Sequence, residues 1–504
     1  MKFMKLLFKS VLAVTVFAIS IQVQASPFAE TSTSDWDEKI VFISGEVVSP
    51  SDKTIEFMFY DLFELQKILT AQIDENNHFQ LSFSLTCPQD FYIRYGGRGT
   101  YLGTLFCSPG DSLFIKINAN YKSQTNSDES RFVIKGTNKQ TNDLIFNFLN
   151  KIPKENHIYA NYDIAIKSKS PLEYLEYIKE REKLYRDFYD KFVSENQTTE
   201  MFRKWASKML KYESYDDLLK YTWYHPDLNK ISPSSFDIPK EYFVFLESYD
   251  MNDSEIISMK HALFLHEYAL YFTRRIENNL EDKFKTAIED TGNVGAFAIL
   301  KELIEKYTSG FTKDFLFTRS LYSLLKGHAL EEFRQVYDAG MVNNDYFNQV
   351  INTELNNLIS FLSNSNTESA NISILDSQSD VINELTSKYS GKWIYIDFWA
   401  TWCGPCLAEF DASKKLQEEW KERDIVFVYL ANRSPENAWK ATIANRKLSG
   451  EHILLTNDQY NILSAEFNIT GIPHHVLIGK NGNIISKNAP RPSEREKLIK
   501  LIIF

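Results

Sequence analysis

The feature that most constrains the fold is an apolar run that ends at two closely spaced cysteines. The run KWIYIDFWA covers residues 392–400, and its β-branched and aromatic residues are typical of a buried strand. Cys403 and Cys406 follow within the sequence CGPC, and the residues after them predict a helix. The cysteines are therefore expected where a buried strand passes into the first turn of a helix.

The start of a helix changes the chemistry of a cysteine. The first N–H groups of a helix have no partner within it, and the macrodipole is positive there. Both effects favour a thiolate at Cys403, since such places lower a thiol pKa from ~8.5 to ~7 or below. Cys403 could then attack a substrate disulfide. Cys406, one turn further on, could attack Cys403 in turn, releasing the reduced substrate and leaving an internal disulfide.

Two other uses of a cysteine pair fit the sequence less well. A zinc site needs two more ligands, and the chain has no second C-x-x-C and no His or Cys at finger spacing. A structural staple between residues three apart closes a very small loop and restricts the unfolded chain little. The sequence thus predicts a redox pair that uses neither a metal nor another cofactor.

The hydrophobic pattern changes along the chain and predicts a multidomain protein. Short runs rich in β-branched and aromatic residues predict an N-terminal β-sandwich over residues 26–137. Helical spacing predicts a central all-α region over 138–365, and strand–helix alternation predicts a C-terminal α/β domain over 366–504. The sandwich strands are expected at 39–48, 54–60, 78–85, 90–95, 100–107, 112–117 and 131–136. In the C-terminal domain, helices are expected at 381–389, 403–423, 434–447 and 492–502, strands at 392–400 and 424–432, and a hairpin at 466–486.

Residues 1–25 are typical of a secretory signal peptide. Lysines lead into an apolar run that ends at Ala25. An uncleaved membrane anchor is the alternative, although the apolar run is short for a span. Export would place the protein in the periplasm or cell envelope, where disulfides persist. The formal charge of −11 and the lack of a basic run argue against a nucleic-acid partner.

Two further cysteines, Cys87 and Cys107, fall on or beside neighbouring expected strands of the sandwich. In an oxidising compartment they could form a structural disulfide, Cys87–Cys107. Two buried free thiols fit the residues equally well. Neither cysteine is expected to act in catalysis.

The sequence DFWATWCGPC, followed later by GIP, resembles the thioredoxin superfamily. The similarity is to its exported TlpA/ResA-like group of thiol–disulfide oxidoreductases, and it covers about residues 370–504. Upstream, FCSPGDSLFIKI and RFVIKGTNKQTN resemble the β-sandwich that precedes such domains in exported multidomain members. The resemblance implies a thioredoxin-like fold for the C-terminal domain.

The resemblance also implies further site residues. Pro473, in GIP, matches a cis-proline that faces the active site, and the backbone of Ile472 would pair with an extended substrate. Asp397 matches a buried acid that can take the proton from Cys406. Trp402 matches the aromatic residue beside the nucleophile. The residues alone allow Asp397 to be a solvated acid and Trp402 to be a packing residue.

Two positions near the site keep an open role. Glu409 falls where exported members often carry an acid, but Asp411 replaces the proline commonly found soon after the motif. His474 and His475 follow Pro473, so one of them could lie near the thiols and tune them. We take His474 as the candidate, with an exposed histidine as the alternative.

The sequence therefore predicts an exported thiol–disulfide oxidoreductase. The Gly-Pro dipeptide between the cysteines is that of thioredoxin, which is a reductant, and this favours a reducing role. The expected partners are disulfide-containing proteins and a membrane electron donor, with cytochrome c maturation as one setting. The alternative is a binding or scaffold protein of the cell envelope that carries a thioredoxin-like domain.

Overall fold

The structure is a computed structural model that describes residues 38–96, 100–118, 132–152, 164–232, 236–277, 279–363, 371–376 and 379–502. The expected signal peptide and the expected domain boundary at 365–366 lie outside these residues. Contacts divide the described chain into two compact units, 38–280 with 309–312 and 281–308 with 313–502. The central helices are therefore shared between the units, and the domain boundaries read from the sequence stay a prediction.

The first unit begins with two four-stranded sheets, ordered β4-β1-β7-β8 and β3-β2-β5-β6. Their strands are β1 Lys39–Val48, β2 Thr54–Asp61, β3 Leu65–Gln72, β4 His78–Leu85, β5 Gln89–Tyr95, β6 Thr100–Cys107, β7 Ser112–Asn118 and β8 Phe132–Gly136. All seven strands expected from the sequence are present within a residue or two. The strand that the sequence did not predict is β3, whose Leu65, Ile68 and Leu69 have the spacing of a helix.

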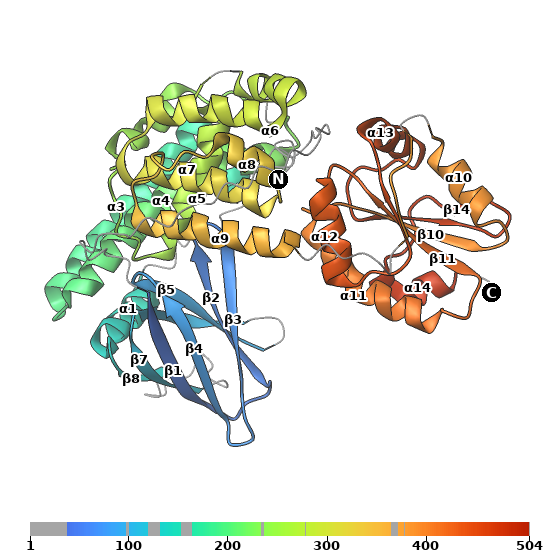
Figure 1. The fold of residues 1–504 in the computed structure, drawn as a ribbon. Helices are drawn as coiled ribbons and strands as arrows, with labels where there is room; N and C mark the ends of the chain where they lie inside the picture. The colour runs from blue at the N-terminus through green and yellow to red at the C-terminus, as the bar shows by residue number, and fades with distance from the viewer. Residues whose placement is uncertain are drawn as a thin grey trace. The chain divides into compact units, whose positions relative to one another are not determined.

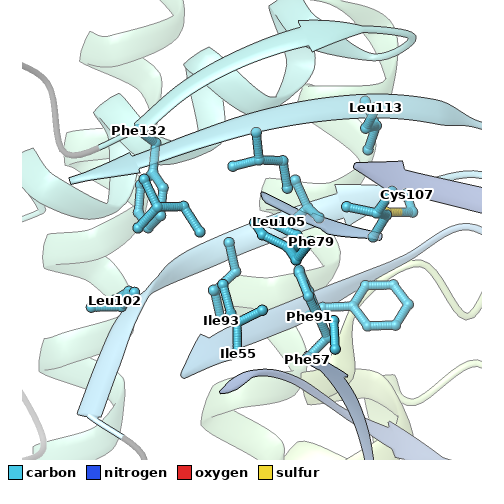
Figure 2. Packing of buried hydrophobic residues seen from close by; sticks show 14 of the residues in the cluster. Ile55, Phe57, Phe79, Phe91, Ile93, Leu102, Leu105, Cys107, Leu113 and Phe132 are labelled. Carbon is cyan, nitrogen blue, oxygen red and sulfur yellow. The ribbon is translucent and has the colours of Figure 1, made fainter. Parts of the chain in front are cut away.

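The inner faces of these sheets share one hydrophobic core. Phe57 of β2 and Phe79 of β4, which belong to different sheets, pack with their ring centroids 6.1 Å apart. Figure 2 shows these rings with Phe91 and Leu105 among the buried side chains of this core. Alternation along each strand supplies such residues, because every second side chain points to the same face.

The helical elements follow and are amphipathic or buried. They are α1 Lys139–Lys151, α3 Pro171–Glu195, α4 Glu200–Asn229, η3 Lys240–Ser248, α5 Met259–Arg275, α6 Leu280–Tyr307, α7 Gly310–Lys326, α8 Leu330–Val336 and α9 Asp345–Ser363. Helix α3 buries one stripe of its surface, since Tyr174, Ile178 and Phe192 are all buried. None of the described helices is long and apolar enough to span a bilayer.

One buried carboxylate ties the strands of the first unit to its helices. Asp90 of β5 accepts a hydrogen bond from the Met259 N–H at 2.6 Å and another from the Trp205 indole N–H at 2.8 Å. These donors belong to α5 and α4, and burial raises the pKa of Asp90 to about 6. Both oxygens of this buried acid are therefore satisfied by donors from the helices.

The second unit contains a six-stranded sheet, ordered β14-β13-β10-β11-β12-β9. Its elements are β9 Asn371–Ser373, α10 Val381–Lys388, β10 Trp393–Trp399, α11 Gly404–Glu419, β11 Ile425–Ala431, α12 Glu436–Arg446, β12 Glu451–Leu454, α13 Asn457–Glu466, β13 His474–Ile478, β14 Ile484–Ser486, η4 Pro492–Glu494 and α14 Arg495–Ile499. Strands β9 to β12 run parallel, whereas β13 is antiparallel to β10 and β14 to β13.

Helices cover both faces of this sheet (Figure 1). Buried residues of α11, α12 and α14 join one hydrophobic cluster, and those of α10 and α13 join the other. The expected helices and strands are present, and the hairpin turns at Asn481-Gly482, where Gly482 takes a positive φ of 80°. The sequence did not predict β9, β12 or α13. Strand β9 is only three residues long and strand β12 only four.

We expect Asp90→Ala to destabilise the first unit. The change leaves the N–H groups of Trp205 and Met259 buried without an acceptor, at a cost of about 1–3 kcal/mol for each group. Chemical denaturation followed by tryptophan fluorescence measures the loss. Asp143→Ala is the matched control, because this exposed residue pairs only with Lys139 on its own helix, and such pairs contribute below about 0.5 kcal/mol. Equal losses in the two variants would contradict the assignment.

Candidate redox site

Strand β10 presents alternate residues to the two faces of its sheet. Tyr395 and Trp399 pack in the cluster that contains the two cysteines, whereas Ile396 and Phe398 pack in the cluster on the other face. Asp397 lies between Tyr395 and Trp399 in the alternation, so its side chain is on the face that α11 covers. It is 1 % exposed, which makes it a buried acid rather than a solvated one.

The cysteine pair lies at the start of α11. Cys403 is the N-cap residue, and its sulfur accepts a hydrogen bond from the Cys406 backbone N–H at 3.2 Å. The two residues form a disulfide with their Cα atoms 5.2 Å apart. Cys406 is completely buried and Cys403 is 4 % exposed, while Gly404 and Pro405 are exposed. The first turn thus directs a backbone donor at the sulfur of Cys403.

The segment before β13 contains the cis-proline. The Ile472–Pro473 peptide bond is cis, and Pro473 is partly buried. Ile472 is also partly buried and packs against both hydrophobic clusters of the domain. Because β13 pairs with β10, this segment is held at the end of the strand that leads to the cysteines.

The loop after β11 fixes the turn that precedes the cysteines. The Trp402 indole N–H donates to the carbonyl of Arg433 at 2.9 Å, and the Thr401 N–H donates to the hydroxyl of Ser434 at 3.0 Å. Trp402 is partly buried and packs against the cluster of the cysteines. Its indole is therefore oriented by a hydrogen bond in addition to packing.

The two histidines after Pro473 point to opposite faces. His475 is paired with Asp397 across β13 and β10, and its Nε2 lies 3.3 Å from Asp397 Oδ1. His474 instead contacts the ring of Phe398 on the other face, and its Nε2 lies 2.6 Å from the carbonyl oxygen of Lys487. Burial lowers the pKa of His474. The structure therefore directs His475, and not the candidate His474, toward the face of the cysteines.

Glu409 anchors the end of the chain. Its carboxylate is 9 % exposed and accepts hydrogen bonds from the Ser493 N–H at 3.0 Å and the Ser493 hydroxyl at 2.8 Å. Tyr395 holds the same segment, because its hydroxyl donates to the carbonyl of Pro490 at 2.7 Å. Both oxygens of Glu409 are thus used to fix η4 against α11.

The structure does not contain the disulfide considered for Cys87 and Cys107. Both thiols are free, which is the second of the two possibilities that the sequence left open. Cys107 is completely buried at the end of β6, and burial raises the pKa of its thiol well above the ordinary value. Cys87 is partly exposed. Neither lies in the unit that holds Cys403 and Cys406.

The described residues contain no group of three or more His, Cys, Asp or Glu side chains arranged to hold a metal ion. Sequence reasoning named His475 as an alternative but took His474 as the candidate, and it missed Ser493, Arg433 and Ser434. Strand alternation after Pro473 could have identified His475, because residues 475 and 477 share a face. No local signal pairs Glu409 with Ser493, which is 84 residues away in the sequence.

A buried strand, a cysteine pair that caps the next helix and a cis-proline before an antiparallel strand together define a thioredoxin-like dithiol–disulfide domain. Comparison with known families agrees, since residues 368–501 match the Redoxin family. The C-terminal part of the chain therefore carries a Redoxin domain, and the resemblance predicted from the sequence is confirmed.

Similar proteins carry names of the same class. The chain is 26 % identical to thiol–disulfide oxidoreductase ResA of Halalkalibacterium halodurans over 130 residues, which are 25 % of this chain and 70 % of that protein. It is 50 % identical to a thioredoxin of Coprinus comatus over 48 residues, 10 % of this chain and 43 % of that protein. ResA of Bacillus cereus is 26 % identical over 97 residues, 19 % of this chain and 54 % of that protein. The chain thus spans about half of the length of the last two relatives.

Among solved structures, a Bacteroides vulgatus protein assigned as a thiol–disulfide oxidoreductase is 38 % identical in sequence. The match covers 23 % of this chain and 74 % of that chain, with a TM-score of 0.21. The Redoxin match and the named relatives support oxidoreductase activity, as the sequence predicts.

We expect the Glu409–Ser493 contact to stabilise the domain without tuning the thiols. Glu409→Ala and Ser493→Ala should each lower the free energy of unfolding by about 1–3 kcal/mol. The double variant should lose less than the sum, because the two residues contact each other. Thermal unfolding gives these values, and iodoacetamide labelling of reduced Cys403 should be unchanged. A changed labelling rate at unchanged stability would instead support the tuning role.

Proposed function

We propose that the protein is an exported thiol–disulfide oxidoreductase that reduces disulfides in other proteins through Cys403 and Cys406. One observation carries the proposal: a cysteine pair caps α11 next to the β13–β10 pairing that begins at a cis-proline. The Redoxin match of the same residues supports it.

In the first step, Cys403 acts as the nucleophile. The positive end of α11 and the Cys406 backbone N–H, 3.2 Å from the Cys403 sulfur in the disulfide form, favour a thiolate at Cys403 after reduction. The thiolate attacks one sulfur of the substrate disulfide and forms a mixed disulfide. The other substrate sulfur leaves as a thiolate and takes a proton from water.

In the second step, Cys406 resolves the mixed disulfide. Its thiol gives its proton to the carboxylate of Asp397, which lies on the same face of the sheet. The Cys406 sulfur then attacks Cys403 and displaces the substrate, which leaves with both electrons. The product on the protein is the Cys403–Cys406 disulfide, the form that the structure contains.

The substrate is proposed to be an extended polypeptide segment. The backbone at Ile472 would pair with it, next to the cis-proline, and the indole of Trp402 would contact it beside the nucleophile. Both side chains are partly buried, so each combines a fixed position with some access to solvent. Recognition through backbone pairing favours protein substrates over small thiols.

The proposed location is the periplasm or cell envelope, and it rests on the signal-like sequence of residues 1–25. A reductase there needs an electron donor, and a membrane protein that reduces the Cys403–Cys406 disulfide would supply the electrons. Cytochrome c maturation is one process that needs reduced thiols in that compartment. We propose that the two sheets of residues 39–136 form a β-sandwich that, with the helices, positions substrates or the redox domain.

Substitution of each cysteine tests the mechanism. Cys403→Ser should abolish reduction of insulin disulfides, because no nucleophile remains to form the mixed disulfide. Cys406→Ser should still form mixed disulfides and should hold them, because the resolving thiol is missing. Turbidity of insulin and non-reducing gels measure the two effects. Cys87→Ser is the control, since this free thiol lies in the other unit.

Two outcomes would favour the alternative of a binding or scaffold protein. Absence of insulin reduction by the unchanged protein would remove the enzymatic role. An unchanged cell phenotype in that variant would show that the rest of the chain carries the function.

The reduction potential tests the direction of electron flow. We expect a reduction potential of about −270 mV for the Cys403–Cys406 pair. This is the value of thioredoxin, which has the same dipeptide between its cysteines. Equilibration with glutathione or dithiothreitol mixtures, followed by alkylation, measures it. A reduction potential of about −120 mV would indicate that the protein oxidises thiols instead.

A further inference from the structure

Asp397 and His475 form a buried acid–imidazole pair on the face of the sheet that also carries the redox disulfide. They occupy directly opposite positions of β10 and β13, and Asp397 Oδ1 lies 3.3 Å from His475 Nε2. Each side chain is 2 % exposed. Alternation places both on the face covered by α11, with Tyr395, Leu477 and the cysteines.

Within the described part of the chain, this pair makes no hydrogen bond that would fix its protons. Neither oxygen of Asp397 has a hydrogen-bond partner, and the Nε2 atom of His475 has none. Two hydroxyl groups on this face of the sheet bind other partners. The hydroxyl of Tyr395 donates to the Pro490 carbonyl, and the hydroxyl of Tyr429 bonds the hydroxyl of Ser413 at 2.6 Å.

A buried carboxylate in this situation needs a positive partner or a proton. An isolated charge is costly in the interior, so an acid without donors keeps its proton to a higher pH. An imidazolium at 3.3 Å reverses this preference, because the opposite charge stabilises the carboxylate. Of the described residues, only His475 brings a cationic atom within ion-pair distance of Asp397.

We propose that His475 is a positioning residue of the redox site, whose positive charge beside Asp397 keeps the carboxylate ionised and so able to accept the proton of Cys406. The inference deepens the proposed function and rests on it. Cys406 gives its proton to Asp397, the Cys406–Cys403 bond forms, and the bond from Cys403 to the substrate sulfur breaks. The electron pair leaves with the substrate thiolate, and the proton on Asp397 later passes to water.

Other titratable groups face this pair from each neighbouring element. They are Tyr395 of β10, Tyr429 of β11, Glu409, Cys403 and Cys406 at α11, and Glu494 of η4, whereas His474 of β13 lies on the opposite face. Burial raises the pKa of both tyrosines, so they stay neutral at physiological pH. Both acids have donors of their own, Ser493 for Glu409 and Arg491 N–H for Glu494.

The resolving step can be measured without a protein substrate. Reduced full-length protein attacks the disulfide reagent DTNB at Cys403, and closure by Cys406 releases a second thionitrobenzoate in a phase that does not depend on reagent concentration. In His475→Gln, the carboxylate of Asp397 loses the positive partner at 3.3 Å, so the pH midpoint of closure should rise by about one unit or more. At pH 6, a shift of that size lowers the closure rate of the variant about tenfold relative to the unchanged protein.

Four variants separate this effect from simple damage to the core. His475→Lys restores a positive charge and should return the midpoint toward that of the unchanged protein. Asp397→Asn should remove the pH midpoint of closure, because no carboxylate remains to accept the proton. Adding His475→Gln to this variant should not change its closure profile further. His452→Gln is the matched control, because this imidazole is completely buried and stacks on Tyr429 at 4.9 Å. It should leave the midpoint in place.

The inference is overturned if His475→Gln and the unchanged protein have the same closure profile, or if His452→Gln shifts the midpoint equally. Cooperative thermal unfolding shows that a variant is folded. If His475→Gln is not folded, the closure profiles of His475→Lys and Asp397→Asn test the inference, because only His475→Lys should keep the midpoint of the unchanged protein. Failure of the proposed function has a different signature. It is the absence of insulin reduction by the unchanged protein, which leaves the closure profile readable.

Discussion

The orientation of β10 is the constraint on which the redox site depends. This strand is buried along its whole length and pairs in parallel with β11 from Trp393 to Trp399. A shift of one residue would turn Asp397 away from α11 and toward the opposite cluster, because side chains alternate with a period of two. The same register places the end of the strand where the loop after β11 can fix Trp402, immediately before the nucleophile.

The parts of the fold that the sequence predicted are those with strong local patterns. The apolar run of β10 and the long stripe of α3 are examples, since burial selects their residues at fixed spacing. The missed strand β9 and strand β12 are three and four residues long, too short for a pattern, and β3 has helical spacing. Division of the central helices between two units depends on tertiary contacts, which no local pattern reports.

The candidate site divides in the same way. The cysteines and Pro473 could be found because their chemistry needs particular residue types at short spacing, and the C-x-x-C motif and GIP preserve that spacing. The choice between His474 and His475 was a question of strand parity, which required knowing that β13 pairs with β10 at Asp397. The role of Glu409 depended on Ser493, a residue brought to it only by the packing of the last segment.

Two buried aspartates show how the surroundings of an acid separate structure from chemistry. Asp90 accepts hydrogen bonds at both oxygens from α4 and α5, so its charge is balanced by fixed donors and its effect is to join elements. Asp397 is equally buried but has no hydrogen bond to any described residue, and it faces an imidazole instead. Buried polar groups without partners are rare, and an unpaired carboxylate on the face of a redox pair can accept a proton. Saturating Asp397 with donors would stabilise the strand pair and remove the acceptor that Cys406 needs.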